Sequence, residues 1–204
     1  MTSFDKLIKY FERFPGIGAR QAKRFAFHIL TLEEPDVVEL AELIRTINTS
    51  VATCPSCYRF HSIYNDVLHC QICRNESRDR SKLTIVERDT DIDAIERSGT
   101  YNGLYFVLGG MVPLLDSHDI KKLRGGTLKH LVAERAEQDL AEIILGFSIN
   151  PDGENTGRYI EMLLKDTTTK HAITITHLGR GLSTGSELEY ADSETIKNAF
   201  INRS

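Results

Sequence analysis

Cys54-Pro-Ser-Cys57 and Cys70-Gln-Ile-Cys73, separated by twelve residues, contain all four cysteines of this 204-residue chain. Two C-x-x-C pairs at this separation can place four thiolates tetrahedrally around one Zn²⁺ ion. Four thiolates leave no coordination position for water, so we expect a structural zinc site that does not catalyse. Two disulfides are the alternative, but four cysteines in a chain of this length are too sparse for a secreted disulfide scaffold. The spacing does not require His61 or His69, which lie inside the module, as a ligand.

The composition places the chain among globular proteins without a membrane segment. Hydrophobic residues make up 41% of it, enough to bury a core. The N-terminus, MTSFDKLIKY, lacks the apolar run of a signal peptide, and no apolar stretch approaches the length of a membrane span. We therefore predict a cytoplasmic, nucleoid-associated protein with reduced cysteines and no membrane partner.

The charge is distributed unevenly along the chain. The first 30 residues carry six basic and two acidic side chains, a net charge of +4, so a total of −4 leaves −8 on the remainder. Such asymmetry indicates contact with nucleic acid at the basic end. A solvated helix face is the alternative interpretation of the same charges.

The basic end has the pattern of two helices joined by Pro15-Gly16-Ile17-Gly18. Glycines at Gly16 and Gly18 allow the backbone to approach a phosphate closely, and the free N–H groups at the start of the second helix favour an anion. Arg20, Lys23 and Arg24 follow directly and can reach flanking phosphates. This arrangement predicts a helix-hairpin-helix that binds DNA independently of sequence. An ordinary helical hairpin with a glycine turn is the alternative. Apolar residues recur at helical spacing on both sides of the turn: Phe4, Leu7, Ile8, Phe11, Phe14, Ala22, Phe25, Ala26, Ile29 and Leu30.

The rest of the chain predicts a third helix and then an α/β domain. The third helix is expected over Asp36–Thr49, with Asp36 as its N-cap, and Arg74–Lys82 is expected to be a connector. Strands that alternate with helices argue for a mostly parallel sheet covered on both faces. The predicted strands are Leu83–Glu87, Leu104–Leu108, Glu142–Phe147 and Ala172–Thr176. The predicted helices are Asp89–Arg97, Leu128–Asp139 and Glu154–Leu164.

Acidic residues follow two of these predicted strands. Glu87 closes the first strand, and Asp152 and Glu154 follow the third. Ligands gather beyond the carboxyl ends of parallel strands, where oxygen ligands of this kind could hold Mg²⁺. Helix capping by Asp152 and Glu154 is an equally good explanation.

The pieces in this order resemble the bacterial recombination mediator family RecR along nearly the whole chain. The matching stretches are FPGIGARQAKRFAFHIL, the four cysteines, residues 86–110, NPDGENTGRYI and HLGRGLSTGSELEYADSETI. The acidic domain is similar to a Toprim domain. The resemblance implies a ring-shaped tetramer that acts as a DNA clamp. With RecO and RecF, such a clamp loads RecA on single-stranded gaps coated with SSB.

The resemblance also implies roles for particular residues. Bases at Arg20 and Arg24 would contact DNA, acids at Glu87 and Asp91 would contact RecO, and residues 181–190 match a segment likened to a Walker B motif. Gly181-Leu-Ser-Thr-Gly-Ser186 departs from the family pattern G-L-P-V-G-G, which we expect to alter a subunit contact.

Together these features predict a multi-part α/β protein with four regions. We expect a helix-hairpin-helix region over residues 1–53, a Cys₄ zinc module over 54–78, a Toprim-like domain over 79–176 and a tail used in oligomerisation over 177–204. The leading hypothesis is a DNA clamp and adaptor without enzymatic activity. The alternative is a Mg²⁺-dependent nuclease or phosphotransferase that uses Glu87, Asp152 and Glu154.

Overall fold

The computed structural model describes residues 1–63, 67–114, 123–179, 193 and 195–197. The chain divides into two compact units, Met1–Val51 and Ala52–Ser204. Each unit is described by itself below. No helix in the described part of the chain is both long enough and apolar enough to cross a membrane.

The first unit consists of helices α1 (Ser3–Phe11), α2 (Ala19–Ile29) and α3 (Glu34–Ser50). Thr2 and Asp5 form a capping box that begins α1. Aromatic pairs join α1 to α2: the ring centroids of Phe4 and Phe27 lie 5.1 Å apart. Ala22 and Ala26 are completely buried on α2. These small side chains let the two helices approach closely, which confirms the predicted hairpin.

The second unit contains a four-stranded, entirely parallel sheet in the order β4-β3-β5-β6. Its strands are β3 (Asp79–Val86), β4 (Gly103–Val107), β5 (Glu142–Gly146) and β6 (Thr174–His177). Every residue of β4 and the last four residues of β3 are buried, as expected for a sheet covered on both faces. The predicted α/β fold class is confirmed.

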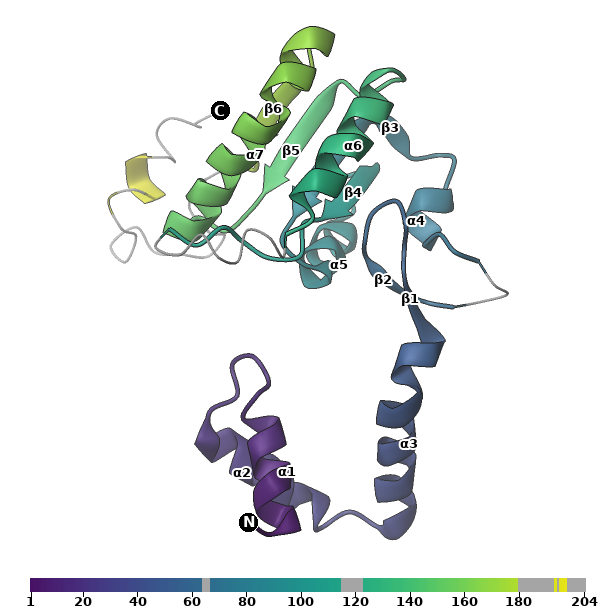
Figure 1. Ribbon diagram of the computed structural model, residues 1–204, viewed down its shortest axis with the longest axis vertical. Coiled ribbons are helices and arrows are strands. Elements are labelled where there is room, and N and C mark those ends of the chain that lie inside the picture. The colour runs from purple at the N-terminus through teal and green to yellow at the C-terminus, as the bar shows by residue number, and fades with distance from the viewer. Residues whose placement is uncertain (64–66, 115–122, 180–192, 194, 198–204) are drawn as a thin grey trace. The chain divides into compact units, whose positions relative to one another are not determined.

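Three helices connect these strands: α5 (Asp89–Ser98), α6 (Gly125–Ala136) and α7 (Pro151–His171). The chain runs from β3 outward to β4 and then crosses back past β3 to β5, so the strand order reverses between β3 and β5. Right-handed crossovers then require α5 on one face and α6 with α7 on the other. Figure 1 shows α6 and α7 side by side in front of the sheet. Ligand sites in such sheets lie where the order reverses, which here is at the carboxyl ends of β3 and β5.

The cysteine module is part of the second unit's core. It contains β1 (Val51–Thr53), β2 (Phe60–Ser62) and the short helix α4 (Gln71–Arg74). Cys54, Cys57 and Cys70 belong to the same buried cluster as the residues of β3 and β4. The Val107 N–H donates to the Cys57 carbonyl at 2.8 Å. The module is therefore packed against the sheet.

Several predicted boundaries were wrong. Helix α3 begins at Glu34, so Asp36 lies in its first turn and Glu33 is the N-cap, because Pro35 is tolerated at the start of a helix. Strand β3 begins at Asp79, inside the predicted connector.

Helix α7 also differs from its predicted range. It extends from Pro151 to His171, because the Asn150 side chain accepts from the Gly153 N–H and caps its start. The chain leaves the helix through Ala172, whose φ is 54°, so β6 begins at Thr174.

Candidate functional site

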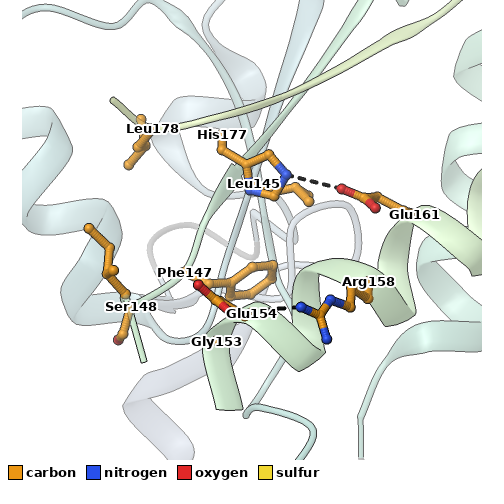
Figure 2. A pocket seen from close by; sticks show the side chains of 10 residues that line it. Leu145, Phe147, Ser148, Gly153, Glu154, Arg158, Glu161, His177 and Leu178 are labelled. Carbon is orange, nitrogen blue, oxygen red and sulfur yellow. Dashed lines mark hydrogen bonds and ion pairs between the residues drawn. The ribbon is translucent and has the colours of Figure 1, made fainter. Parts of the chain in front are cut away.

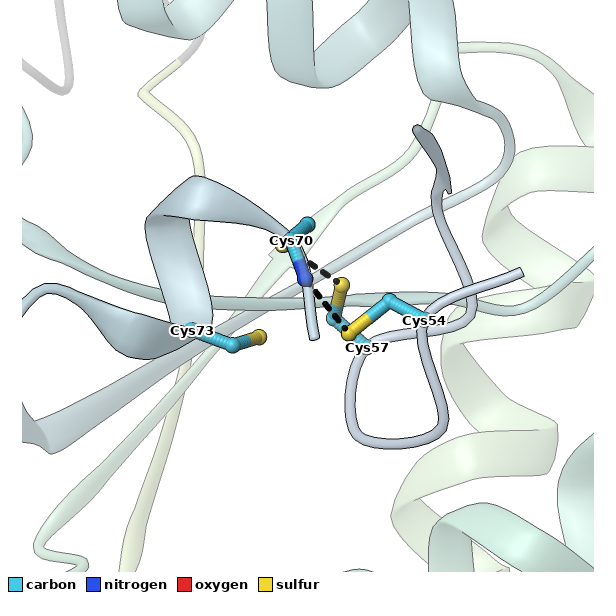
Figure 3. A group of neighbouring side chains, drawn as sticks. All are labelled: Cys54, Cys57, Cys70 and Cys73. Carbon is cyan, nitrogen blue, oxygen red and sulfur yellow. Dashed lines mark hydrogen bonds between the residues drawn. The ribbon is translucent and has the colours of Figure 1, made fainter. Parts of the chain in front are cut away.

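The four cysteines converge on one point, as Figure 3 shows. Their sulfur atoms all lie within 4.8 Å of one another, and the Sγ atoms of Cys57 and Cys70 are 3.6 Å apart. Tetrahedral ligands at the usual zinc–sulfur distance of about 2.3 Å would stand ~3.8 Å from each other. All four cysteines are free in this structure, which favours a metal site over the disulfide alternative. The donor set can bind a metal ion.

Local turns place each cysteine pair. In the first pair, the Cys54 N–H donates to the Arg59 carbonyl and the Tyr58 N–H donates to the Cys54 carbonyl, both at 2.9 Å. Tyr58 adopts a left-handed conformation with φ 63°, which turns the chain back toward β2. In the second pair, Cys70 is the N-cap of α4 and Cys73 lies within that helix. The Cys70 N–H also points at Cys54 Sγ, 3.5 Å away.

The thiols influence one another strongly. Hydrogen bonding with the Cys54 sulfur, then with Cys70, raises the pKa of Cys57, and burial raises it further. Contacts with the other three sulfurs, Cys54 first, raise the pKa of Cys73 in the same way. Four thiolates this close repel one another in the absence of a cation. A divalent ion removes that repulsion and releases the remaining protons on binding.

His61, which lies between the cysteine pairs, is directed elsewhere. Its two ring nitrogens lie 3.1 Å from the carbonyl oxygens of Ser62 and Leu68. It therefore links β2 to Leu68 and contributes no ligand atom to the sulfur cluster.

Two acidic residues of α5 fasten the cysteine module to the α/β domain, a contact that sequence reasoning missed. Asp89 accepts from the Phe60 N–H at 2.6 Å, and Asp93 pairs with Arg59 at 2.8 Å. The Arg124 guanidinium lies 5.2 Å from the centre of the Tyr58 ring. No local pattern connects these residues, because each pair is separated by about thirty or more positions along the chain.

The hairpin presents an open helix terminus. Gly16 has φ 76°, a conformation that favours glycine, and a Cβ at Gly18 would meet no atom within 4 Å. Gly18 is the N-cap of α2 and no side chain caps the helix. The first intrahelical bond runs from the Ala22 N–H to the Gly18 carbonyl. The preceding N–H groups therefore remain available to an anion.

The predicted DNA-binding cations follow this terminus along α2. Arg20, Lys23 and Arg24 all lie in the first turns of α2 and all are exposed. Arg24 contacts Gln21 at 3.4 Å. None of the three cations forms an ion pair with another described residue. The geometry suits phosphate contact without contact to base edges.

The structure places Glu87 and Asp91 at the two ends of one strand-to-helix turn. Glu87 follows β3 and pairs with Arg88. Asp91 accepts from the Arg88 N–H at 2.9 Å and forms part of the capping box of α5. Asp91 thus stabilises the helix start whether or not it also contacts a partner.

Asp152 and Glu154 lie in the first turn of α7 and interact with neighbours there. Asp152 accepts from the Leu114 N–H at 2.9 Å, and Glu154 lies 3.9 Å from Arg158. Among the residues that the structure describes, only the cysteines form a convergent group of metal ligands. Glu87, Asp152 and Glu154 are thus not brought together as a preformed cation site.

A pocket of about 290 Å³ opens at the carboxyl ends of β5 and β6. Figure 2 shows the Arg158 guanidinium directed toward Glu154 and His177 directed toward Glu161, whose carboxylate lies 3.0 Å from Nε2. Arg158 and His177 in this pocket are thus each matched by a carboxylate. The proposed Walker B-like segment, residues 181–190, lies outside the described residues.

Known proteins are similar to this chain along nearly its whole length. The family model described as "RecR, helix-hairpin-helix" matches residues 4–47, a Toprim domain model matches 81–177 and "RecR, C-terminal" matches 181–204. Proteins named Recombination protein RecR from Staphylococcus saprophyticus and Staphylococcus aureus are each 36% identical to this chain. These matches cover 98% of this chain and 95% of each relative.

Proposed function

This chain belongs to the RecR family of recombination proteins, and on that premise we propose that it is a DNA-bound adaptor without catalytic activity of its own. The family indicates a role in recombinational repair. The observation that carries the DNA-binding proposal is the uncapped start of α2, surrounded by Arg20, Lys23 and Arg24. Open N–H groups, a helix dipole and flanking cations together favour a phosphate.

The adaptor acts with RecO, and with RecF, to load RecA on SSB-coated single-stranded gaps. Glu87 and Asp91 provide the contact for RecO. The position of both acids at one turn supports this, because neighbouring carboxylates suit a basic partner surface and speed its encounter. A ring-shaped tetramer, to which the tail contributes contacts, encloses the DNA.

The metal is zinc, one ion per chain, bound by Cys54, Cys57, Cys70 and Cys73. Burial of Cys54, Cys57 and Cys70 supports a structural role, because a buried site offers no room for substrate. Packing of these cysteines against β3 and β4 means that the metal stabilises the α/β domain as well as its own module.

The competing function is a Mg²⁺-dependent nuclease or phosphotransferase. It requires Glu87, Asp152 and Glu154 to surround a cation, with water completing an octahedron. The Asp152 carboxylate instead accepts from the Leu114 N–H, and this favours the adaptor.

The decisive test is Arg20→Ala combined with Arg24→Ala, measured by fluorescence anisotropy on gapped DNA. Each lost phosphate contact lowers the slope of log affinity against log salt by about one. We therefore expect a slope lower by about two and an affinity lower by at least ~10-fold at moderate salt.

Lys6→Ala combined with Arg45→Ala removes the same charge from α1 and α3, away from the turn. This control retains parental binding if the hairpin is the site. Equal losses in both double variants would show that only net charge matters and would refute the assignment.

A further inference from the structure

A second surface with the chemistry of a nucleic-acid site lies on the cysteine module. It is a groove of about 460 Å³ between β2 and α4. That volume lies within the range of sites that bind small molecules. Among the described residues that line the groove none is a carboxylate, whereas four are basic: Arg59, Arg74, His61 and His69. Its side chains thus offer positive and hydrogen-bonding groups to an anion.

The groove also contains an exposed aromatic ring on a fixed backbone. Phe60 is 57% exposed, although its N–H is bound to Asp89 at 2.6 Å. A single exposed apolar side chain is ordinary on a protein surface, so Phe60 is informative only through its neighbours in the groove. An aromatic ring beside cations is typical of proteins that bind single strands, because bases stack on the ring while the cations track the backbone.

The four basic side chains differ in their availability. Arg59 forms an ion pair with Asp93, and the two ring nitrogens of His61 contact backbone carbonyl oxygens. The Arg59 and His61 side chains are therefore already engaged by protein groups. Arg74 is exposed at the end of α4 and has no ion pair among the described residues, and His69 is exposed as well. Arg74 and His69 are therefore the groups left for a ligand.

We propose that this groove binds single-stranded DNA, with one base stacked on Phe60 and the adjoining phosphate held by Arg74 and His69. The proposal rests on the proposed function and adds a contact separate from the hairpin. A single strand fits better than a duplex, because only an unpaired base exposes the face that stacks on an aromatic ring. The protein then distinguishes the two DNA forms at a gap: the hairpin binds any phosphate backbone, and the groove selects the single strand.

The test uses the full-length protein with zinc bound, a fluorescent oligothymidylate and a fluorescent duplex. Loss of one stacked base corresponds to roughly 5- to 150-fold in affinity, so Phe60→Ala weakens single-strand binding by that factor. Arg74→Ala lowers the single-strand salt slope by about 0.7. Both variants bind the duplex as the parent does, and Phe60→Trp restores single-strand binding.

Matched controls separate the groove from general surface effects. Leu114, like Phe60, is 57% exposed but lies outside the groove, and Arg97 is an exposed cation on α5. Leu114→Ala and Arg97→Ala leave single-strand binding unchanged. Zinc content and melting temperature of the Phe60 and Arg74 variants match those of the parent, which shows that the module remains folded.

Photo-cross-linking supplies an independent measurement. Cleavage after Arg59 and Arg74 releases residues 60–74 as one tryptic peptide. An oligonucleotide that carries 5-iodouracil should attach to this peptide. Parental single-strand affinity in Phe60→Ala, with cross-links only outside residues 60–74, would overturn the proposal. A parent protein that binds neither duplex nor single strand would instead refute the proposed function.

Discussion

The sequence offers two sets of candidate metal ligands: the four cysteines, and the acidic residues Glu87, Asp152 and Glu154. Only the first set converges in the structure. The cysteines lie on two tight turns that face each other, and their sulfurs converge. The carboxylates lie near the ends of two parallel strands, where Asp152 accepts from a backbone N–H and Glu87 pairs with Arg88. Proximity to a favourable edge of a sheet does not by itself make a metal site.

The contrast has a physical cause. A C-x-x-C pair specifies its own geometry, because one turn places both sulfurs on the same side of the backbone. A thiol also has few strong alternative partners in a protein, whereas a carboxylate readily accepts from N–H groups and pairs with arginine. Acidic residues are therefore easily committed to capping and clamping, as Asp89, Asp91 and Asp93 are on α5.

The largest expected effect is that of Cys70→Ser. Because binding free energy at a structural zinc site is also folding free energy, loss of one ligand should destabilise the second unit by several kcal/mol. We expect substoichiometric zinc in metal analysis and a marked fall in melting temperature. His69→Ala alters the neighbouring residue and should retain one zinc per chain. A Cys70→Ser protein that melts like the parent would show that the cluster is not needed for folding.

Next in size is the effect of Glu96→Gln, which removes the charge of an acidic residue paired with Arg78. Glu96 accepts from Arg78 at 2.8 Å and from the Tyr105 hydroxyl at 2.6 Å, and the Arg78 side chain is only 12% exposed. Loss of the negative charge leaves Arg78 without its counter-ion, so we expect a loss of ~3 kcal/mol in denaturant unfolding. Glu137→Gln, at an exposed pair with Lys170, should cost less than about 1 kcal/mol.

The stability that the Arg78–Glu96 pair contributes should also depend on pH. Hydrogen bonding with Arg78 lowers the pKa of Glu96 below its ordinary value of 4.5. Its stabilisation is therefore complete above pH 4.5 and is lost as the pH falls through the folded-state pKa. The difference in stability between parent and Glu96→Gln should be constant near neutral pH and shrink in acid. A difference that widens in acid would contradict this assignment.

The fold was largely predictable from the sequence, because the strands of a covered parallel sheet are strongly apolar. The carboxyl ends of β3 and β4 lie within one residue of those predicted by the ranges Leu83–Glu87 and Leu104–Leu108. The start of β3 was missed because Asp79–Lys82 is polar, and only pairing with its neighbours makes it a strand. The strands β1 and β2 were missed because three residues each are too few to show an alternating pattern.

The candidate sites were predictable only where the signal was local. The cysteine spacing and the glycine turn predicted the sulfur cluster and the open start of α2. The contacts of Arg59 with Asp93 and of Phe60 with Asp89 arise from tertiary packing and leave no periodic signal. The groove beside Phe60 depends on that packing, so the sequence could not predict it.

Asp91 and Glu87 provide a smaller and sharper test of the docking proposal. Asp91→Ala removes a helix-capping acceptor and should cost about 1 kcal/mol, whereas Asp91→Asn keeps the acceptor and removes the charge. If the charge contacts RecO, both variants and Glu87→Gln should weaken RecO binding in a titration while zinc content and duplex binding persist. If only Asp91→Ala weakens RecO binding, the effect comes from the loss of helix capping.

The smallest expected effect is that of Mg²⁺ on thermal stability. A site saturated at a hundred times its dissociation constant would add about 2.7 kcal/mol to the folded state, which is readily measured as a shift in melting temperature. Because Asp152 accepts from the Leu114 N–H and its own carbonyl accepts from Thr156, we expect no such site. Millimolar Mg²⁺ should then shift the melting temperatures of the parent and of Asp152→Asn slightly and by the same amount. Asparagine keeps the acceptor for Leu114, so the variant isolates the charge.

A Mg²⁺-dependent rise in the melting temperature of the parent that Asp152→Asn abolishes, together with Mg²⁺-dependent nicking of supercoiled DNA, would show that the carboxylates converge on a cation. That result would make the acidic edge a second metal site and favour the nuclease.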